Sequence, residues 1–142
     1  MKILQGTFAY VISTFLVQAT SHFAISKAHY AAVGFLRAEP VFLLGILSML
    51  VQGVILTHLY RHYAAGASDW MKGWKFGLLT GAFFVSYPAL AEPAKYMVPS
   101  VSSWMTTEAI AGFVQFSLFG LTVGRLFRTS DTEASRRSVK VD

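Results

Sequence analysis

The chain of 142 residues has no cysteine and few charged residues. The absence of cysteine excludes disulfides, thiolate metal sites and cysteine nucleophiles. Charged residues make up 13% of the chain, whereas about 25% is typical of a soluble domain. Hydrophobic residues make up 54%, so the composition is typical of an integral membrane protein.

The sequence also lacks the motifs of common enzymes and of nucleic-acid-binding proteins. It contains no serine nucleophile elbow, no phosphate-binding glycine loop and no zinc-hydrolase spacing. The net charge of +5 comes from basic residues beside apolar segments, where such residues orient a protein in the bilayer. We therefore expect a non-enzymatic membrane protein without a nucleic-acid partner, and the sequence names no cofactor.

Four apolar segments approach the length of about 20 residues that a helix needs to cross a bilayer. They predict an all-α integral membrane bundle of four transmembrane helices within one domain, 1–128. The predicted spans are about 3–23, 40–60, 74–92 and 105–127. The mixed segment between the first two spans predicts an interfacial loop or short helix. The polar remainder, 129–142, predicts a flexible cytoplasmic tail.

Lys and Arg are distributed unequally between the two sides that four spans define. The side with both termini carries nine: Lys2, Arg61, Lys72, Lys75, Arg125, Arg128, Arg136, Arg137 and Lys140. The other side carries three: Lys27, Arg37 and Lys95. Cytoplasmic loops are enriched in Lys and Arg, so we expect both termini to be cytoplasmic.

Two of the predicted spans carry glycines at helical spacing. Gly73, Gly77 and Gly81 recur every fourth residue in the third span, and Gly120 and Gly124 form a similar pair in the fourth. Such glycines share one face of a helix and let the backbones of two membrane helices approach closely. They either pack the two spans together as a hairpin or leave one face free for a partner chain.

Polar residues gather where the predicted spans reach the outer side. Each of the four spans contributes at least one residue at this level, and ionisable groups at membrane depth are costly and usually functional. The candidate ligand-binding residues are Glu92, Glu108, His22, Glu39, Gln18, Gln115 and Lys95. They predict an outward-facing polar cluster that binds or passes a small ligand or ion. The alternative is that the acids lie at the water interface, where they start helices or pair with Lys95 and Arg37.

A second group of candidates is His58 and His62, near the cytoplasmic end of the second span. Four residues apart, they share one helical face, and two imidazoles there can chelate a metal or provide an axial haem ligand. Two imidazoles alone make an incomplete site. Interfacial histidines without any ligand are the alternative.

Three functions follow from these features. The leading hypothesis is a small multi-pass membrane protein whose outward-facing cluster binds or passes a ligand or ion. The alternative is a structural or assembly subunit of a larger membrane complex. The third is a membrane haem or redox protein that uses His22, His58 or His62. In each case we expect contact with the lipid bilayer and either a homo-oligomer or a partner membrane subunit, because a chain this small is too short for a transporter built from inverted repeats.

Four stretches of the chain also carry a resemblance to a known group of proteins. They are KILQGT at 2–7, EPVFLLGILSMLVQGVILTHLY at 39–60, KFGLLTGAF at 75–83, and the segment from Glu108 to FGLTVG at 119–124. In this order they resemble small uncharacterised four-helix bacterial membrane proteins, over nearly the whole chain up to Phe127. The resemblance implies a four-helix architecture and a bacterial inner-membrane location, and it implies no activity.

Overall fold

The computed structural model describes residues 1–34, 37, 39–65 and 67–128, and within them the fold is all-α. The predicted tail, 129–142, lies outside the described residues. In chain order the elements are α1 (Lys2–Thr20), a π-helical turn (Ser21–Ile25), α2 (Lys27–Ala31), α3 (Phe42–Ala64), α4 (Trp70–Ser86), a second π-helical turn (Tyr87–Ala91), α5 (Glu92–Lys95) and α6 (Val101–Leu126).

Three helical segments are long and apolar enough to cross a membrane: Lys2–Ile25, Phe42–Ala64 and Val101–Leu126. They correspond to the predicted spans 3–23, 40–60 and 105–127. The fourth predicted span, 74–92, is divided between α4, which has 17 residues, and the second π-helical turn. This segment is not among the three, so the fourth span stays a prediction.

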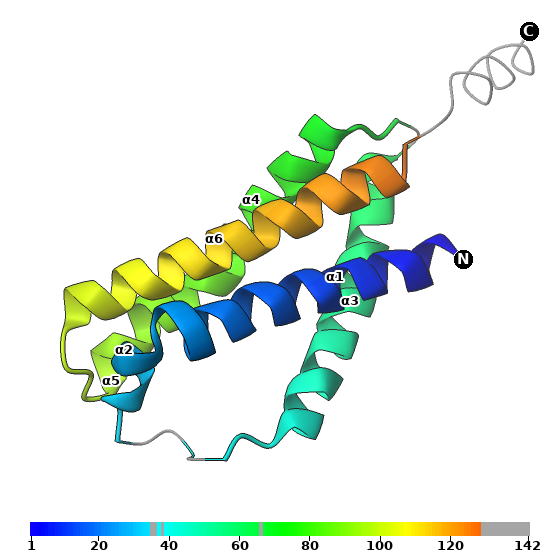
Figure 1. Cartoon of the computed structure of the whole chain (residues 1–142). Coiled ribbons are helices and arrows are strands. Elements are labelled where there is room, and N and C mark those ends of the chain that lie inside the picture. The colour runs from blue at the N-terminus through cyan, green and yellow to red at the C-terminus, as the bar shows by residue number, and fades with distance from the viewer. Residues whose placement is uncertain (35–36, 38, 66, 129–142) are drawn as a thin grey trace, which may run out of the picture.

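The closest helix pair is α4 with α6, which lie antiparallel along most of their length (Figure 1). A Cβ atom added to Gly73 would collide with the backbone of Gly120 and Gly124. A Cβ atom added to Gly77 would collide with the carbonyl oxygen of Phe116. The predicted packing glycines of the two helices therefore face one another, and only glycine permits this backbone separation.

The pair α1 and α3 crosses at a second close contact. Gly6 of α1 lies against the side chain of Thr57, and Gly53 of α3 lies against Thr7, where an added Cβ would come within 3.1 Å of the Thr7 side chain and carbonyl oxygen. In each helix, a glycine therefore lies opposite a threonine of the other helix. This crossing fixes the C-terminal half of α3 against the bundle.

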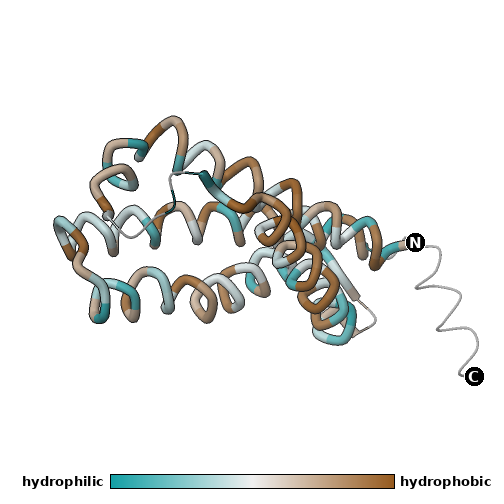
Figure 2. The backbone as a smooth tube through the Cα atoms, turned by 90° about the horizontal axis from the view of Figure 1, so that it is seen from below, coloured by the Kyte–Doolittle hydropathy of each residue, from teal (hydrophilic) through white to brown (hydrophobic). Residues whose placement is uncertain are grey.

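The N-terminal half of α3 departs from the other helices (Figure 1). Its apolar side chains are exposed on most sides; Leu43 is 74% exposed and Val51 is 51% exposed. Figure 2 shows that apolar positions run almost continuously along α3 and that hydrophilic positions gather at its C-terminal end. An all-round apolar surface is typical of a helix in contact with lipid.

The start of α1, the end of α3, the start of α4 and the end of α6 lie at one end of the bundle (Figure 1). We call this the basic end, because the described Lys and Arg residues there are Lys2, Arg61, Lys72, Lys75, Arg125 and Arg128. The opposite end holds both π-helical turns, α2 and α5.

The helical segment after α4 bends at the opposite end. Pro88 has no backbone N–H, so a regular α-helical hydrogen bond is missing at this position. The chain passes through the π-helical turn Tyr87–Ala91 instead, and the Pro88 carbonyl accepts a hydrogen bond from the indole nitrogen of Trp104 at 2.9 Å. The π-helical turn at Pro88 is therefore part of the contact with α6.

Candidate functional site

A hydrogen-bonded network centred on Gln115 lies between α1 and α6. The Gln115 side-chain nitrogen donates to the Thr14 hydroxyl at 3.0 Å and to the Tyr10 hydroxyl at 3.4 Å. The Gln18 side-chain nitrogen donates to the Gln115 side-chain oxygen at 2.7 Å. Gln115 is only 4% exposed, so its amide needs these partners to offset the loss of water.

The network extends to α3 through Tyr10 and Gln52. The Tyr10 hydroxyl donates a short hydrogen bond to the Gln52 side-chain oxygen. The Gln52 side-chain nitrogen donates to the Ser48 hydroxyl at 3.0 Å. Polar groups from three helices are thus joined at the level where α3 leaves the bundle.

Glu108 lies on α6 two helical turns from Gln115, toward the opposite end. The residue is 9% exposed, and its carboxylate accepts a hydrogen bond from the Tyr30 hydroxyl at 2.6 Å. Burial raises the pKa of Tyr30, and the adjacent Glu108 carboxylate raises it further. Tyr30 therefore remains a hydrogen-bond donor at physiological pH.

His22 joins this group through its ring. The imidazole stacks on the Tyr30 ring with a centroid distance of 3.7 Å and an interplanar angle of 11°. Its Nδ1 atom lies 3.0 Å from the Gln18 carbonyl oxygen. Gln18, His22, Glu108 and Gln115 are thus brought into one connected set, with Tyr30 as the link between His22 and Glu108.

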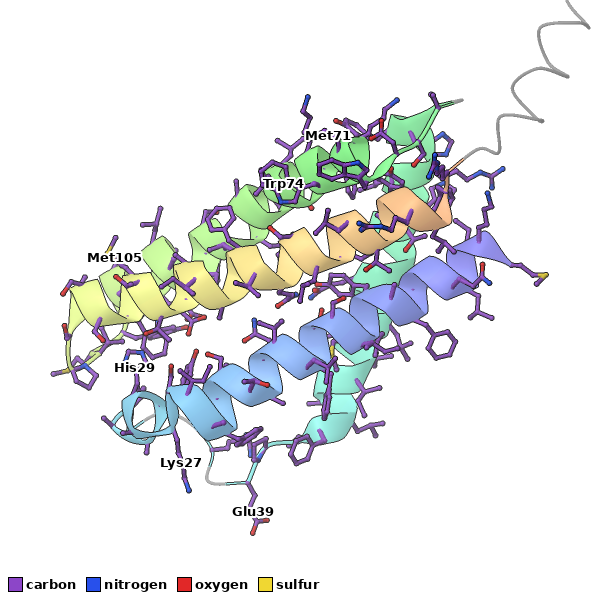
Figure 3. The ribbon with its side chains drawn as sticks, turned by 45° about the horizontal axis from the view of Figure 1, so that its top comes forward. Lys27, His29, Glu39, Met71, Trp74 and Met105 are labelled. Atoms are coloured by element: carbon purple, nitrogen blue, oxygen red, sulfur yellow. The ribbon has the colours of Figure 1, made fainter. Side chains whose placement is uncertain are left out.

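The other three candidates lie at the margin of this set or away from it. Glu92 is partly buried, and its burial together with the Glu108 carboxylate raises the pKa of Glu92. Lys95 is exposed and donates to the Tyr87 hydroxyl at 3.0 Å. Glu39 is exposed ahead of α3, and Figure 3 shows its side chain, like that of Lys27, projecting away from the bundle.

A cavity of about 200 Å³ adjoins these groups. Its polar lining consists of Tyr10, Thr14, Gln18, Gln52, Glu108 and Gln115. Its apolar lining consists of Phe84, Val85, Pro88, Gly112 and Phe116. We call this space the polar cavity; its lining offers a carboxylate, three amides and two hydroxyls to a bound molecule.

A packed layer separates the polar cavity from the basic end. Leu56, Tyr60, Phe119 and Val123 are almost completely buried there, with Tyr60, Phe119 and Val123 at 0% exposed. The Tyr60 hydroxyl lies 2.6 Å from the Ser68 hydroxyl, which donates to the Gly124 carbonyl oxygen at 2.9 Å. The cavity is therefore closed on this side.

His58 and His62 lie on the exposed surface of α3, near the basic end. Their Nε2 atoms are 3.2 Å apart and their ring centroids 4.8 Å apart. Among residues 1–34, 37, 39–65 and 67–128, no group of three or more His, Cys, Asp or Glu side chains is arranged to hold a metal ion.

Four polar residues that belong to the site were not among the candidate ligand-binding residues: Tyr10, Thr14, Tyr30 and Gln52. Tyr10 and Thr14 precede Gln18 by eight and four residues, so the helical face that contains Gln18 carried the signal. Gln52 could also have been recognised, because it is a polar residue inside the second predicted span. Tyr30 gave no signal, because it lies in a short mixed segment whose partner is 78 residues away.

Comparison of the chain with protein-family models, with curated proteins and with solved structures finds no match.

Proposed function

We propose that this chain is a four-span protein of the bacterial inner membrane that binds a small solute in the polar cavity. Three of its helical segments are long and apolar enough to span a membrane. The fourth span in this proposal is α4 with its π-helical turn. Backbone contact at Gly73 and Gly77 holds α4 against α6, so both helices occupy the same depth of the bilayer. The start of α1 and the end of α6 lie at the same end of the bundle, which fits an even number of spans (Figure 1).

The charge distribution supports a cytoplasmic position for the basic end. Six described Lys and Arg residues lie there, and three lie at the opposite end: Lys27, Arg37 and Lys95. Lys and Arg near the ends of spans favour the cytoplasmic side. The polar cavity, which lies toward the opposite end, then opens on the outer half of the membrane.

One observation carries the binding proposal: the nearly buried Glu108 carboxylate lines an open space together with amides and hydroxyls. A carboxylate offers about four acceptor positions, and Tyr30 occupies one of them. Enclosing such a group within a membrane bundle is costly, so a partner that complements it is favoured. Solutes that complement it are small cations that donate hydrogen bonds, such as primary ammonium ions.

The packed layer at Tyr60 and Phe119 favours binding over passage. Both side chains are 0% exposed, and interiors packed in this way leave no route for an ion. Transport would require Tyr60 to move away from Ser68. The closed arrangement fits a binding protein, or a transporter with its inner side shut.

The test is thermal unfolding of the purified protein in methylammonium or ethylammonium chloride, with sodium chloride at equal ionic strength as the reference. A ligand that binds only the folded state stabilises it by about 2.7 kcal/mol at one hundred times its Kd. We expect the Tm of the wild type to rise with ammonium concentration. Glu108→Gln should lose this response, because an amide keeps an oxygen for Tyr30 but removes the charge.

Glu39→Gln is the matched control, because Glu39 is exposed outside the cavity. It should respond as the wild type does. Equal stabilisation of wild type and Glu108→Gln, or no stabilisation of the wild type by either ion, would contradict the proposal.

A further inference from the structure

The helices α3 and α4 meet near the basic end and diverge from there. The Phe76 ring lies 5.1 Å from the Tyr60 ring and 5.4 Å from the Tyr63 ring, measured between centroids. Toward the opposite end the two helices separate (Figure 1). They therefore form an angle that is closed at the aromatic contact and open at the start of α3.

The polar cavity lies in this angle. Gln52 of α3 lines one side of it, and Phe84, Val85 and Pro88 of α4 and the following turn line the other. α3 and α4, which line two sides of the cavity, separate toward the opposite end of the bundle (Figure 1).

The walls of the angle beyond the cavity are apolar. Phe83 follows Phe76 by seven positions, so it shares the face of α4 that meets α3. Tyr87, four residues after Phe83, begins the turn that follows α4. Phe83 is 76% exposed. On α3, Met49 and Gly45 precede Gln52 by three and seven positions and share its face. The space beside Gly45 is open, because a Cβ atom added there meets nothing within 4 Å.

We propose that the ligand of the polar cavity is an amphiphile that enters from the bilayer, with a hydroxyl- or amino-bearing head and an apolar chain. Its head lies among Glu108, Gln115 and Gln52, and its chain lies between α3 and α4. This inference rests on the proposed function, because it assigns a ligand class to the same cavity. The volume supports it: about 200 Å³ is below the range of about 300–1,000 Å³ for pockets that enclose a whole ligand, so the rest of the molecule occupies the angle.

The test uses a long-chain primary alkylamine with a photoreactive diazirine in the middle of its chain, applied to the protein in lipid vesicles. We expect labelled peptides from the facing walls, 45–52 on α3 and 83–87 at the end of α4 and the start of the following turn. Glu108→Gln should reduce this labelling severalfold, whereas Glu39→Gln should leave it unchanged. The same photoreactive alkyl probe without the amino group measures background labelling of lipid-facing surfaces. Its labelling should be the same in the wild type and in Glu108→Gln.

A second variant tests the binding of the ligand's apolar chain separately from the binding of its polar head. Gly45→Leu places an apolar side chain in open space, so it should fold normally while it occupies the room of the ligand's chain. We expect this variant to lose the labelling by the long-chain amine and to keep its stabilisation by ethylammonium.

Three results would overturn the inference. Labelling spread evenly over α1 and α3 in all variants would show only lipid contact. Stabilisation by ethylammonium without labelling of the walls would support the proposed function but exclude an amphiphile as the ligand. A disulfide between two Gly45→Cys chains in native membranes would show that a second copy occupies the angle, since the native chain contributes no cysteine.

Discussion

The Tyr30 hydroxyl donates a hydrogen bond of 2.6 Å to the Glu108 carboxylate, and this contact joins α2 to α6. It holds a short helix beneath the opposite end of the bundle, where Tyr30, Val33 and Trp104 are buried together. The bond matters for both parts of the site: it orients the carboxylate that lines the polar cavity, and it fixes the ring on which His22 stacks.

Replacing Tyr30 by Phe should destabilise the protein by about 1–3 kcal/mol, because it leaves the nearly buried Glu108 carboxylate without its donor. Thermal or denaturant unfolding in detergent measures the change. Tyr63→Phe is the control, because the Tyr63 side chain is 41% exposed and its substitution should alter stability little. Equal effects of the two substitutions would show that the Tyr30 hydroxyl contributes nothing.

Replacing Gly120 by Ala should destabilise the α4–α6 pair by about 1–3 kcal/mol, the usual cost of forcing atoms into a packed interface. The new Cβ would collide with the Gly73 carbonyl oxygen and lie 3.0 Å from the Gly77 Cα. Gly45→Ala is the control, because its Cβ meets open space and alanine favours the helix. The melting temperatures of the two variants should therefore shift in opposite directions.

The pH dependence of stability should contain a contribution from Glu92. Its folded pKa is raised above the ordinary 4.5, chiefly by burial and also by Glu108. A raised folded pKa means that the folded state holds the proton more tightly, so this contribution is complete below pH 4.5 and is lost as the pH rises through the folded pKa. Glu92→Gln should remove that loss, which melting curves across this pH range would detect. A pH profile identical to that of the wild type would contradict the prediction.

The absence of cysteine allows the orientation to be measured directly. We expect a single cysteine at Ser26 to react in intact cells with a membrane-impermeant thiol reagent, and a single cysteine at Arg61 to react only after the cells are opened. The reverse pattern would place the basic end outside and contradict the proposed topology.

The long apolar helices were predictable from sequence, because the length and hydropathy of a membrane helix are local properties. The first and last residues of these helices were less predictable. Helix α6 begins at Val101, one turn before the predicted residue 105, because the Ser100 hydroxyl accepts a hydrogen bond from the Ser103 backbone nitrogen. Helix α3 continues to Ala64, where the Lys72 side chain donates to the Ala64 carbonyl oxygen. Both boundaries depend on particular polar contacts.

The site was predictable only in part, for a similar reason. Glu108 and Gln115 share a face of one helix, so their proximity follows from their spacing. The positions of Glu39 and Lys95 depend on how the connecting segments fold, and the structure places them apart from Glu108. The contribution of Gln52 depends on the angle at which α3 crosses α1, which no local pattern specifies.

That crossing also has a mechanical consequence. With Gly6 against Thr57 and Gly53 against Thr7, α3 is anchored from its middle toward its C-terminal end, and its N-terminal half can pivot there. Its first residue, Phe42, lies about 16 Å along the helix from Gly53 at 1.5 Å per residue. A rotation of about 10° at Gly53 would therefore move the start of α3 by about 3 Å and change the width of the space between α3 and α4.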